Sequence, residues 1–145
     1  MGLDPGSLLT LTHGLALADA AWRRRCAELL RVTDMDLGVL LDLMRAGHTT
    51  HDALVAALDL SAGGAEALVQ RLEGQGLLRR EHDIERPRHG RLVLSPAATL
   101  ELEAVTASAV ERLEELASAL LPHERSVLAR QLKALTVALA PSIVF

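Results

Sequence analysis

A chain of 145 residues has room for one compact core but not for a second independent domain, so we expect a single domain over residues 1–145. Half of the residues are apolar, yet only Trp22 and Phe145 are aromatic, which leaves Leu, Val and Ala to fill the interior. The net charge of -4 argues against a protein that coats nucleic acid through bulk positive charge. Composition therefore favours a mainly α fold with few, short strands.

Two features of the sequence bear on the compartment. The single cysteine, Cys26, cannot form an internal disulfide, and the N-terminal segment lacks the basic region and the apolar run of a signal peptide. Charges and turns interrupt the Leu- and Ala-rich segments, so none approaches the roughly 20 apolar residues of a membrane span. We therefore expect a cytoplasmic protein with no membrane partner.

The first part of the chain predicts two helices. From Leu8 to Leu30 the apolar residues recur every three or four positions, as on one face of a long helix. Thr33 followed three residues later by Asp36 resembles a capping box, and the apolar segment that starts there ends at Gly47, which predicts a buried second helix. The stripe of the first helix consists of Leu11, Leu15, Ala18, Trp22, Cys26 and Leu29.

The middle of the chain predicts a helix-turn-helix. Thr49 and Thr50 can cap a short helix, and the turn at residues 59–61 leads into a second one. Two short helices joined by a tight turn form this motif. The residues expected to face inward are Leu54, Val55 and Leu58 on the first helix and Leu68, Val69 and Leu72 on the second.

A β-hairpin is expected after the helix-turn-helix. Gly74 and Gly76 end the second short helix, and residues 77–80 and 91–94 are short extended candidates on either side of a charged, turn-rich segment. Between residues 71 and 91 six basic side chains stand against four acidic ones. This modest local excess of positive charge is the kind of surface that DNA binding needs.

Two further helices complete the predicted fold. The Ser-Pro pair at 95–96 is a typical helix start, and Pro122 ends that long helix and begins the last one. The helices at 8–31 and 96–141 have apolar stripes larger than a lobe of residues 33–95 can cover, so we expect them to form the dimerisation region of a homodimer. The main dimer contacts are expected from Leu11, Leu15, Leu128, Leu132, Leu135 and Leu139.

The order of these elements resembles the MarR family of winged helix-turn-helix transcription regulators, from about Leu8 to Ala140. The segment Leu68-Val-Gln-Arg-Leu-Glu-Gly-Gln-Gly-Leu-Leu-Arg-Arg80 resembles the end of the family's recognition helix, its glycine turn and the first wing strand. Arg88 stands six residues before Leu94-Ser95, the spacing between the family's wing-tip arginine and its next helix. Leu121-Pro-His-Glu-Arg125 resembles the start of the family's last helix.

The resemblance implies a dimer that binds a palindromic site on double-stranded DNA, with the second helix of the helix-turn-helix in the major groove and the wing at the adjacent backbone or minor groove. The resemblance also implies a small apolar or phenolic ligand that binds in a pocket lined by Trp22, Met35 and Met44 and so alters the geometry of the dimer. These three side chains are equally typical of an ordinary hydrophobic core. The DNA-contacting positions carried over from the family are Thr50, His51, Ser61, Gly63, Gly64, Glu66, Ala67, Gln70, Arg71, Arg86, Arg88 and His89.

The predicted recognition helix departs from the family, which usually has Ser, Thr and Arg at its front. Gly63 and Gly64 each weaken the helix by about 1 kcal/mol relative to Ala. Glu66 would repel phosphates, although a carboxylate can accept a hydrogen bond from a cytosine amino group. Arg86 replaces the family's wing aspartate. The leading hypothesis is a ligand-responsive repressor, and the alternative is a winged-helix dimer that has lost specific DNA readout and serves as a ligand-binding or protein-interaction scaffold.

No arrangement of side chains predicts catalysis, a cofactor or a metal. The chain lacks a nucleophile with a base, paired carboxylates and a phosphate loop, so we do not expect an enzyme. His48 and His51 form a His-x-x-His pair, but no further ligand completes a metal motif. Cys26 follows three arginines that would lower the pKa of a peroxide-sensing thiol, yet it lies on the apolar stripe, which favours a buried structural cysteine.

Overall fold

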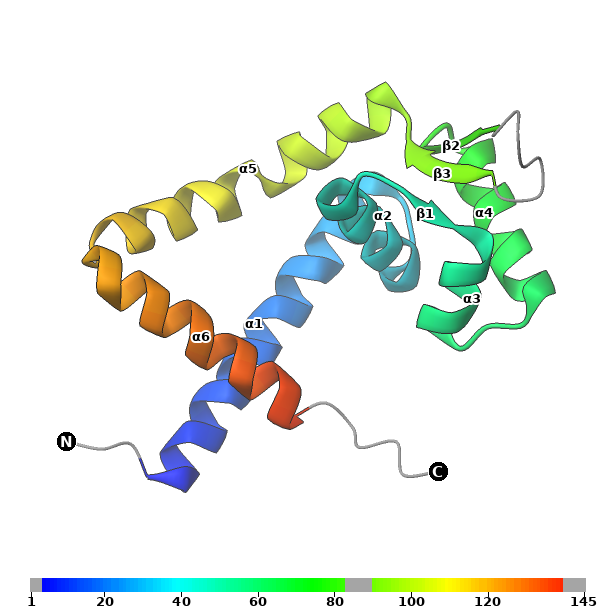
Figure 1. The fold of residues 1–145 in the computed structure, drawn as a ribbon. Coiled ribbons are helices and arrows are strands. Elements are labelled where there is room, and N and C mark those ends of the chain that lie inside the picture. The colour runs from blue at the N-terminus through cyan, green and yellow to red at the C-terminus, as the bar shows by residue number, and fades with distance from the viewer. Residues whose placement is uncertain (1–3, 83–89, 140–145) are drawn as a thin grey trace. The chain divides into compact units, whose positions relative to one another are not determined.

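The computed structural model describes residues 4–82 and 90–139 of the chain (Figure 1). The chain divides into two units, residues 1–106 and 107–145, which are described separately. The division lies inside the helix that follows the hairpin. The wing residues Arg86, Arg88 and His89, which the family resemblance assigns to DNA contact, lie outside the described residues.

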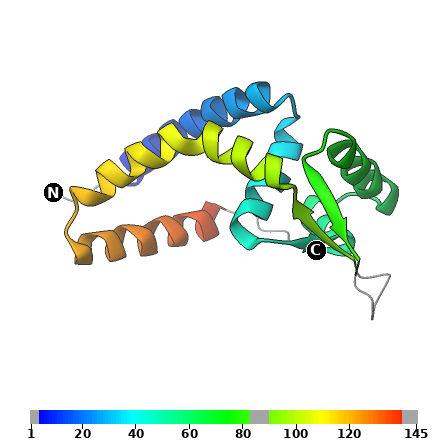
Figure 2. The ribbon, with the colours of Figure 1, turned by 90° about the horizontal axis from the view of Figure 1, so that it is seen from above.

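Helices make up most of the described chain, and a small antiparallel sheet lies in the first unit (Figures 1 and 2). The predicted mainly α fold with a small β wing is therefore confirmed. In the part of the chain that the structure describes, no helix is both long and apolar enough to cross a membrane. In chain order the elements are α1 (Pro5–Leu30), α2 (Asp34–Ala46), β1 (Thr49–Thr50), α3 (His51–Leu58), α4 (Ala62–Gly74), β2 (Leu78–Glu81), β3 (Arg91–Leu94), α5 (Pro96–Ser118) and α6 (Pro122–Leu139).

Side-chain caps begin the helices where the sequence predicts them. Thr33 and Asp36 form a complete capping box at the start of α2, and Gly47 ends that helix with a φ of 84°. Thr50 caps α3 and Ser61 caps α4, each by accepting a hydrogen bond from the backbone amide three residues further on. These caps fix both ends of the turn between α3 and α4, which together form the predicted helix-turn-helix.

The sheet has a strand that the sequence did not predict. β3 lies between β1 and β2 and pairs with both in antiparallel orientation. β1 is only the dipeptide before α3, in which Thr49 pairs with Leu92 and Thr50 with Arg91. Two residues are too few to show the alternating pattern of a strand, so these threonines were predicted only as caps. The extra strand connects the start of the helix-turn-helix to the wing.

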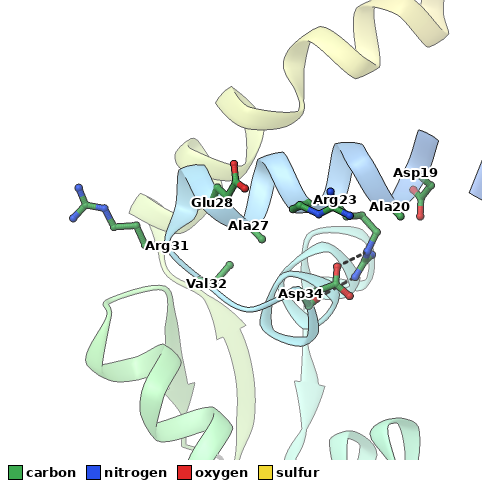
Figure 3. Close-up of a pocket in the computed structure, with 9 residues that line it drawn as sticks. Asp19, Ala20, Arg23, Ala27, Glu28, Arg31, Val32 and Asp34 are labelled. Carbon is green, nitrogen blue, oxygen red and sulfur yellow. Dashed lines mark hydrogen bonds and ion pairs between the residues drawn. The ribbon is translucent and has the colours of Figure 1, made fainter. Parts of the chain in front are cut away.

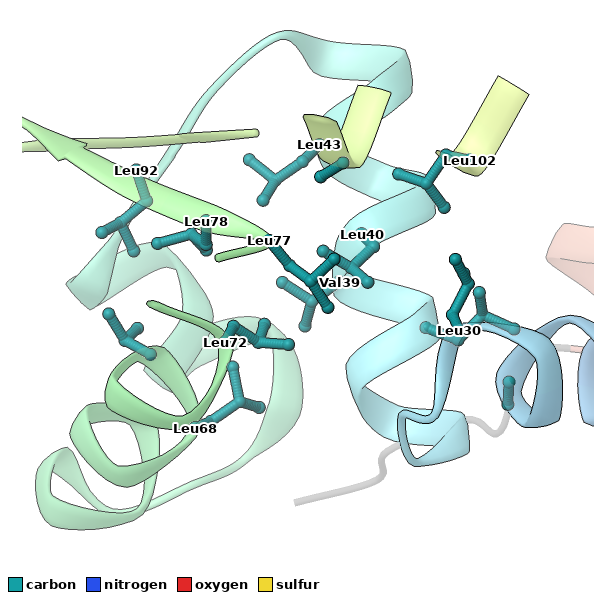
Figure 4. Packing of buried hydrophobic residues seen from close by; sticks show 14 of the residues in the cluster. Leu30, Val39, Leu40, Leu43, Leu68, Leu72, Leu77, Leu78, Leu92 and Leu102 are labelled. Atoms are coloured by element: carbon teal, nitrogen blue, oxygen red, sulfur yellow. The ribbon is translucent and has the colours of Figure 1, made fainter. Parts of the chain in front are cut away.

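The core of the first unit lies between α1, α2, α4, the sheet and the first half of α5 (Figure 4). Leu37, Leu40 and Leu43 are almost completely buried, so α2 is the central helix that the sequence predicts. The inward face predicted for α4 is also confirmed. The buried cluster consists of Cys26, Ala27, Leu30, Leu37, Val39, Leu40, Leu43, Leu54, Leu68, Val69, Leu72, Leu77, Leu78, Leu92, Ala98 and Leu102.

In the last turn of α1 the predicted apolar stripe and the buried face differ. Leu29 is 53% exposed, whereas Ala27 and Leu30 are buried. In its last turn α1 therefore packs against the core through the face that contains Cys26, Ala27 and Leu30. Residues at this spacing are neighbours on one side of a helix. Spacing alone could not choose between Leu29 and Leu30, because each lies three or four positions after Cys26.

The second unit contains the end of α5 and all of α6. Within residues 107–138 no side chain is buried, although both helices carry many leucines and valines. Two helices without a buried side chain have little hydrophobic stabilisation of their own. Large apolar side chains of this unit that are exposed include Val110, Leu113, Leu116, Leu121, Val127, Leu128, Leu132 and Val137.

A buried ion pair joins α2 to α4. Asp36 is 1% exposed, and its Oδ1 and Oδ2 accept hydrogen bonds of 2.6 and 3.1 Å from Nη2 and Nε of Arg71. Oδ2 also accepts the backbone N–H of Thr33 at 3.3 Å. Burial alone would raise the pKa of Asp36, but the hydrogen bonds from Arg71 and Thr33 outweigh it and hold that pKa below its ordinary value. One carboxylate thus caps α2 and holds α4.

We expect Arg71→Met to destabilise the protein by roughly 3 kcal/mol, because it leaves the Asp36 carboxylate buried without its cation. The value lies at the low end for a broken buried pair, since the Arg71 side chain itself is 46% exposed. Urea unfolding at matched protein concentration measures the change. Because the pKa of Asp36 is lowered in the folded state, the stability that the pair contributes is complete above the ordinary aspartate pKa of about 4 and is lost as the pH falls through the lowered value.

Arg45→Met is the matched control for this experiment. Arg45 and Asp42 form a pair of 3.6 Å on the same helix α2, but both side chains are 78% exposed. Exposed pairs contribute little, so the control should lose at most about 0.5 kcal/mol and should show no additional acid sensitivity. Equal losses in the two variants would contradict the role assigned to the buried pair.

Candidate nucleic-acid interface

Helix α4 has a buried face and an open face. Ala65, Leu68, Val69 and Leu72 are buried against the core. The other side carries residues that the family resemblance places in the major groove, so the structure brings these predicted residues together on one helix surface. Those that are exposed are Ser61, Gly63, Ala67 and Gln70, whereas Gly64 and Glu66 are partly exposed.

The two glycines at the front of α4 have different surroundings. A Cβ atom at Gly63 would meet no other atom within 4 Å. A Cβ atom at Gly64 would lie 3.2 Å from Oγ of Ser61, the oxygen that caps the helix. The absence of a side chain is therefore useful to the cap at Gly64, whereas at Gly63 it leaves open space on the exposed face.

Glu66 is the acidic residue on the open face of α4, and two side chains hold it. Its Oε1 accepts hydrogen bonds from Nη2 of Arg80 on β2 at 2.6 Å and from Nε2 of Gln70 on α4 at 3.1 Å. Nε of Arg80 donates in turn to Glu73 at 3.1 Å. The hydrogen bond from Arg80 keeps the pKa of Glu66 below its ordinary value, so the carboxylate is charged at neutral pH.

His51 lies where α3 and α4 meet. Its Nε2 is 3.1 Å from the backbone oxygen of Ala62 and 3.8 Å from Oε2 of Glu66. Thr50 precedes it and caps α3. The two residues predicted to approach the DNA backbone are therefore next to the start of α4, as the helix-turn-helix geometry requires.

Most of the predicted basic excess is neutralised inside the protein. Arg71 pairs with Asp36, Arg80 with two carboxylates of α4, and both Arg79 and Arg91 with Glu81. The sequence assigned Arg71 to DNA contact through the family resemblance, whereas Arg79, Arg80 and Arg91 counted only as local positive charge. The partner of Arg71 lies 35 residues away in the chain, so nothing in the local sequence indicated that pair.

The predicted ligand-pocket residues lie on different surfaces. Met35 and Met44 are nine residues apart on α2, which is about two and a half turns, so they project from opposite sides of that helix. Both are exposed. Trp22 packs against the core of the first unit, and its indole Nε1 is buried with no hydrogen-bond partner among the described residues.

Two grooves among the described residues of the first unit are lined by other residues than these three. The larger, of about 630 Å³, follows the last turns of α1 and the turn into α2 (Figure 3). Arg23 reaches across it, where Nε donates to Oδ1 of Asp34 at 2.9 Å. The smaller groove, of about 190 Å³, lies between α2 and α3. The larger one has the size of many small-molecule sites and a mixture of arginines and carboxylates along its walls.

Cys26 is 2% exposed, and burial raises the pKa of its thiol. Its Sγ lies 3.8 Å from the backbone oxygen of Val105. Low exposure and a raised pKa both disfavour a reactive thiolate, which agrees with the interpretation of Cys26 as a structural residue. Among the described residues no three His, Cys, Asp or Glu side chains gather in a way that would hold a metal ion.

The fold matches solved structures over nearly the whole chain. A mutant MepR from a multidrug-resistant clinical isolate of S. aureus has a TM-score of 0.71 and 19% identity over 96% of this chain and 99% of its own. Another S. aureus MepR mutant, bound to an oligodeoxyribonucleotide, has a TM-score of 0.60 and 21% identity over 91% and 97%. NadR in complex with 4-hydroxyphenylacetate has a TM-score of 0.63 and 20% identity over 86% and 91%.

These proteins are MarR-family transcription regulators rather than enzymes. This chain has the MarR fold. No protein-family model matches the chain, and no curated protein matches its sequence. The likeness therefore comes from the arrangement of the helices and the sheet, as the resemblance in element order predicts.

The surroundings of the two glycines in this MarR fold predict different effects of alanine. Gly63→Ala should raise the free energy of unfolding by about 0.5 to 1 kcal/mol, because alanine is the better helix former and its Cβ has free space. Gly64→Ala should gain less, since its Cβ would press on the capping oxygen of Ser61. Thermal unfolding of both variants at one protein concentration is the measurement. A larger gain at Gly64 than at Gly63 would show that the cap does not limit this position.

Proposed function

We propose that this chain is a cytoplasmic transcription repressor that binds a palindromic DNA site as a homodimer. The observation that carries the proposal is the open face of α4, from Ser61 to Gln70, presented by a capped helix-turn-helix beside a three-stranded sheet. A helix in this setting docks in the major groove. The MepR mutant bound to an oligodeoxyribonucleotide, which shares the fold, supports the same use of the fold here.

Exposed apolar surface on two helices supports the dimer. The N-terminal half of α1 and residues 127–137 of α6 carry leucines and valines that the single chain leaves open to water. Monomeric proteins rarely expose so many large apolar side chains together, and a second copy of the same chain covers them in a closed symmetric arrangement. The exposed residues on these helices are Leu8, Leu9, Leu11, Leu15, Leu17, Val127, Leu128, Leu132 and Val137.

Charges placed on α6 should prevent the dimer. The double variant Leu128→Glu with Leu132→Glu puts two carboxylates on neighbouring turns of the apolar face, where burial against a partner would cost several kcal/mol. We expect light scattering at micromolar concentration to give a dimer for the natural sequence and a monomer for this variant. Lys133→Glu, an exposed change on the same helix, should remain dimeric. A natural chain that is monomeric at micromolar concentration would contradict the proposal.

The open face of α4 has few groups that can read bases, so we expect phosphate contacts to provide most of the affinity. The family resemblance assigns such contacts to Arg86 and Arg88 of the wing. Arg71 bonds Asp36 through Nε and Nη2, so its Nη1, which has no hydrogen-bond partner among the described residues, can donate to a phosphate. Each phosphate contact releases counterions, so binding should weaken steeply as salt is added.

Arg88→Ala tests this mode of binding. We expect it to lower the affinity for cognate and scrambled duplexes by similar factors and to flatten the slope of log affinity against log salt by roughly one unit per lost contact. Fluorescence anisotropy across a salt series gives both quantities. Arg24→Ala, a loss of the same charge on α1, should leave the slope unchanged. If Arg88→Ala weakened only the cognate duplex, the wing would read sequence instead.

A specific observation favours the alternative function, a scaffold without sequence-specific DNA binding. The arginines of the described lobe that lie near α4 are paired with carboxylates, which reduces the positive field that steers DNA. The salt series separates the two functions, because a chain that binds neither duplex even at low salt has the scaffold role.

The proposal includes a small apolar or phenolic ligand that changes the affinity of the dimer for DNA. The complex of NadR with 4-hydroxyphenylacetate supports such a ligand for this fold. In this chain the buried indole Nε1 of Trp22 is a donor without a partner among the described residues. A phenol or carboxylate that accepted this hydrogen bond would remove the cost of leaving it unsatisfied.

A further inference from the structure

The open face of α4 has few side chains that can form hydrogen bonds with bases. Its first turns expose Ala62, Gly63 and Ala67, none of which has a polar side chain. Glu66 and Gln70 are the long polar side chains on this surface, and they are joined to one another by a hydrogen bond. Direct base readout by α4 therefore depends on the donor and acceptor atoms of Glu66 and Gln70 that are not used in the hydrogen bond between them.

The two oxygens of Glu66 are in different states. Oε1 accepts hydrogen bonds from Arg80 and Gln70 and is satisfied. Among the described residues Oε2 accepts no hydrogen bond, and Nε2 of His51 lies 3.8 Å from it. The side chain is 37% exposed, so solvent or a ligand reaches it. Oε2 is thus an anchored oxygen that can only accept a hydrogen bond.

Bases differ in whether they offer a donor to such an oxygen. In the major groove cytosine presents its N4 amino group, whereas guanine presents the acceptors N7 and O6, and thymine presents O4 and a methyl group. An oxygen that only accepts therefore favours cytosine and repels guanine and thymine. Adenine presents a donor at N6 next to the acceptor N7, which makes it the weaker match of the two amino bases.

We propose that Glu66 selects a cytosine in each half of the DNA site and that Arg80 of β2 is the positioning residue that aims its carboxylate. This inference rests on the proposed DNA-binding function. Arg80 performs two tasks. Its 2.6 Å hydrogen bond fixes the rotamer of Glu66, and its positive charge compensates the carboxylate, so that the helix approaches the phosphates with less repulsion.

Arg80 is itself held in place. Glu73, two turns further along α4, accepts hydrogen bonds from its Nε, whereas Glu66 accepts from its Nη2. A guanidinium held between two carboxylates has little freedom to move, so Glu66 loses little further side-chain entropy when DNA binds. Such preorganisation distinguishes Glu66 from an ordinary exposed glutamate.

The test is selection from a pool of duplexes with randomised sequence, followed by sequencing of the bound fraction. For the natural chain we expect one position in each half-site to be enriched in cytosine. Glu66→Gln keeps an Oε1 that accepts from Arg80 but replaces Oε2 by an N–H₂ donor. It should lose the cytosine preference at that position by about tenfold or more, and shift it towards bases with acceptors. Total binding to the pool at low salt should stay within about threefold, since phosphate contacts are unchanged.

Glu103→Gln is the matched control, because it removes the same charge from an exposed side chain of α5, outside the contacts that hold Glu66 and Arg80. It should leave the cytosine preference in place. Arg80→Met should relax the preference at that position without moving it elsewhere, and Arg80→Lys should partly restore it. A role in stability alone would instead lower the melting temperature and leave base preference unchanged.

The outcomes separate this inference from the function on which it rests. A natural chain that binds no duplex at low salt would overturn the DNA-binding function itself. Binding of the pool with the same base preference in the natural chain and in Glu66→Gln would leave that function standing and overturn the role of Glu66. Loss of preference in Glu66→Gln but not in Arg80→Met would overturn the positioning role of Arg80.

Discussion

The buried carboxylate of Asp36 is the group on which the helix-turn-helix lobe depends. It accepts the backbone N–H of Thr33, which completes the cap of α2, and it accepts hydrogen bonds from Nε and Nη2 of Arg71, which connect it to α4. A buried charge is costly unless every lone pair is satisfied, so the two helices are constrained to the one arrangement in which it is. Arg71 follows Gln70 directly in α4. Because Asp36 fixes the guanidinium of Arg71, it also restricts rotation of α4 about its axis and so the direction in which residues 61–70 face.

The same chemistry limits how this lobe would interact with DNA in the proposed function. Arginines that a sequence count assigns to a basic surface are hydrogen-bonded to carboxylates of the same lobe, including Arg80 between Glu66 and Glu73. The helix surface near α4 is thus close to neutral, and it orients its side chains before any ligand arrives. A surface of this kind contributes orientation and base preference more than it contributes attraction. Attraction must come from phosphate contacts elsewhere, with the salt dependence that follows from counterion release.

Local signals explain how much of the fold could be predicted. The caps at Thr33, Thr50 and Ser61, the Gly47 stop and the Ser-Pro start of α5 each depend on a few consecutive residues, and all are present in the structure. Errors arose where the deciding partner is distant or the segment short. The strand at 49–50 is defined by its pairing with β3, which lies far along the chain. Packing against the core decides that Leu30 rather than Leu29 is buried. The candidate site followed the same rule, because helix positions came from the pattern but the ion pairs of Arg71 and Arg80 did not.

In the proposed function, dimerisation and base reading depend on one another. The first unit has a core of its own, whereas the described part of the second unit buries no side chain and gains stability only when its leucines are covered. A single Glu66 contact that favours cytosine by about tenfold is too weak to distinguish a site from the rest of a genome. Two such contacts, placed at a fixed spacing by a symmetric dimer, multiply to about a hundredfold and additionally require the two half-sites to be correctly spaced. Under this proposal the exposed leucines of α1 and α6 would contribute to specificity as directly as α4 does.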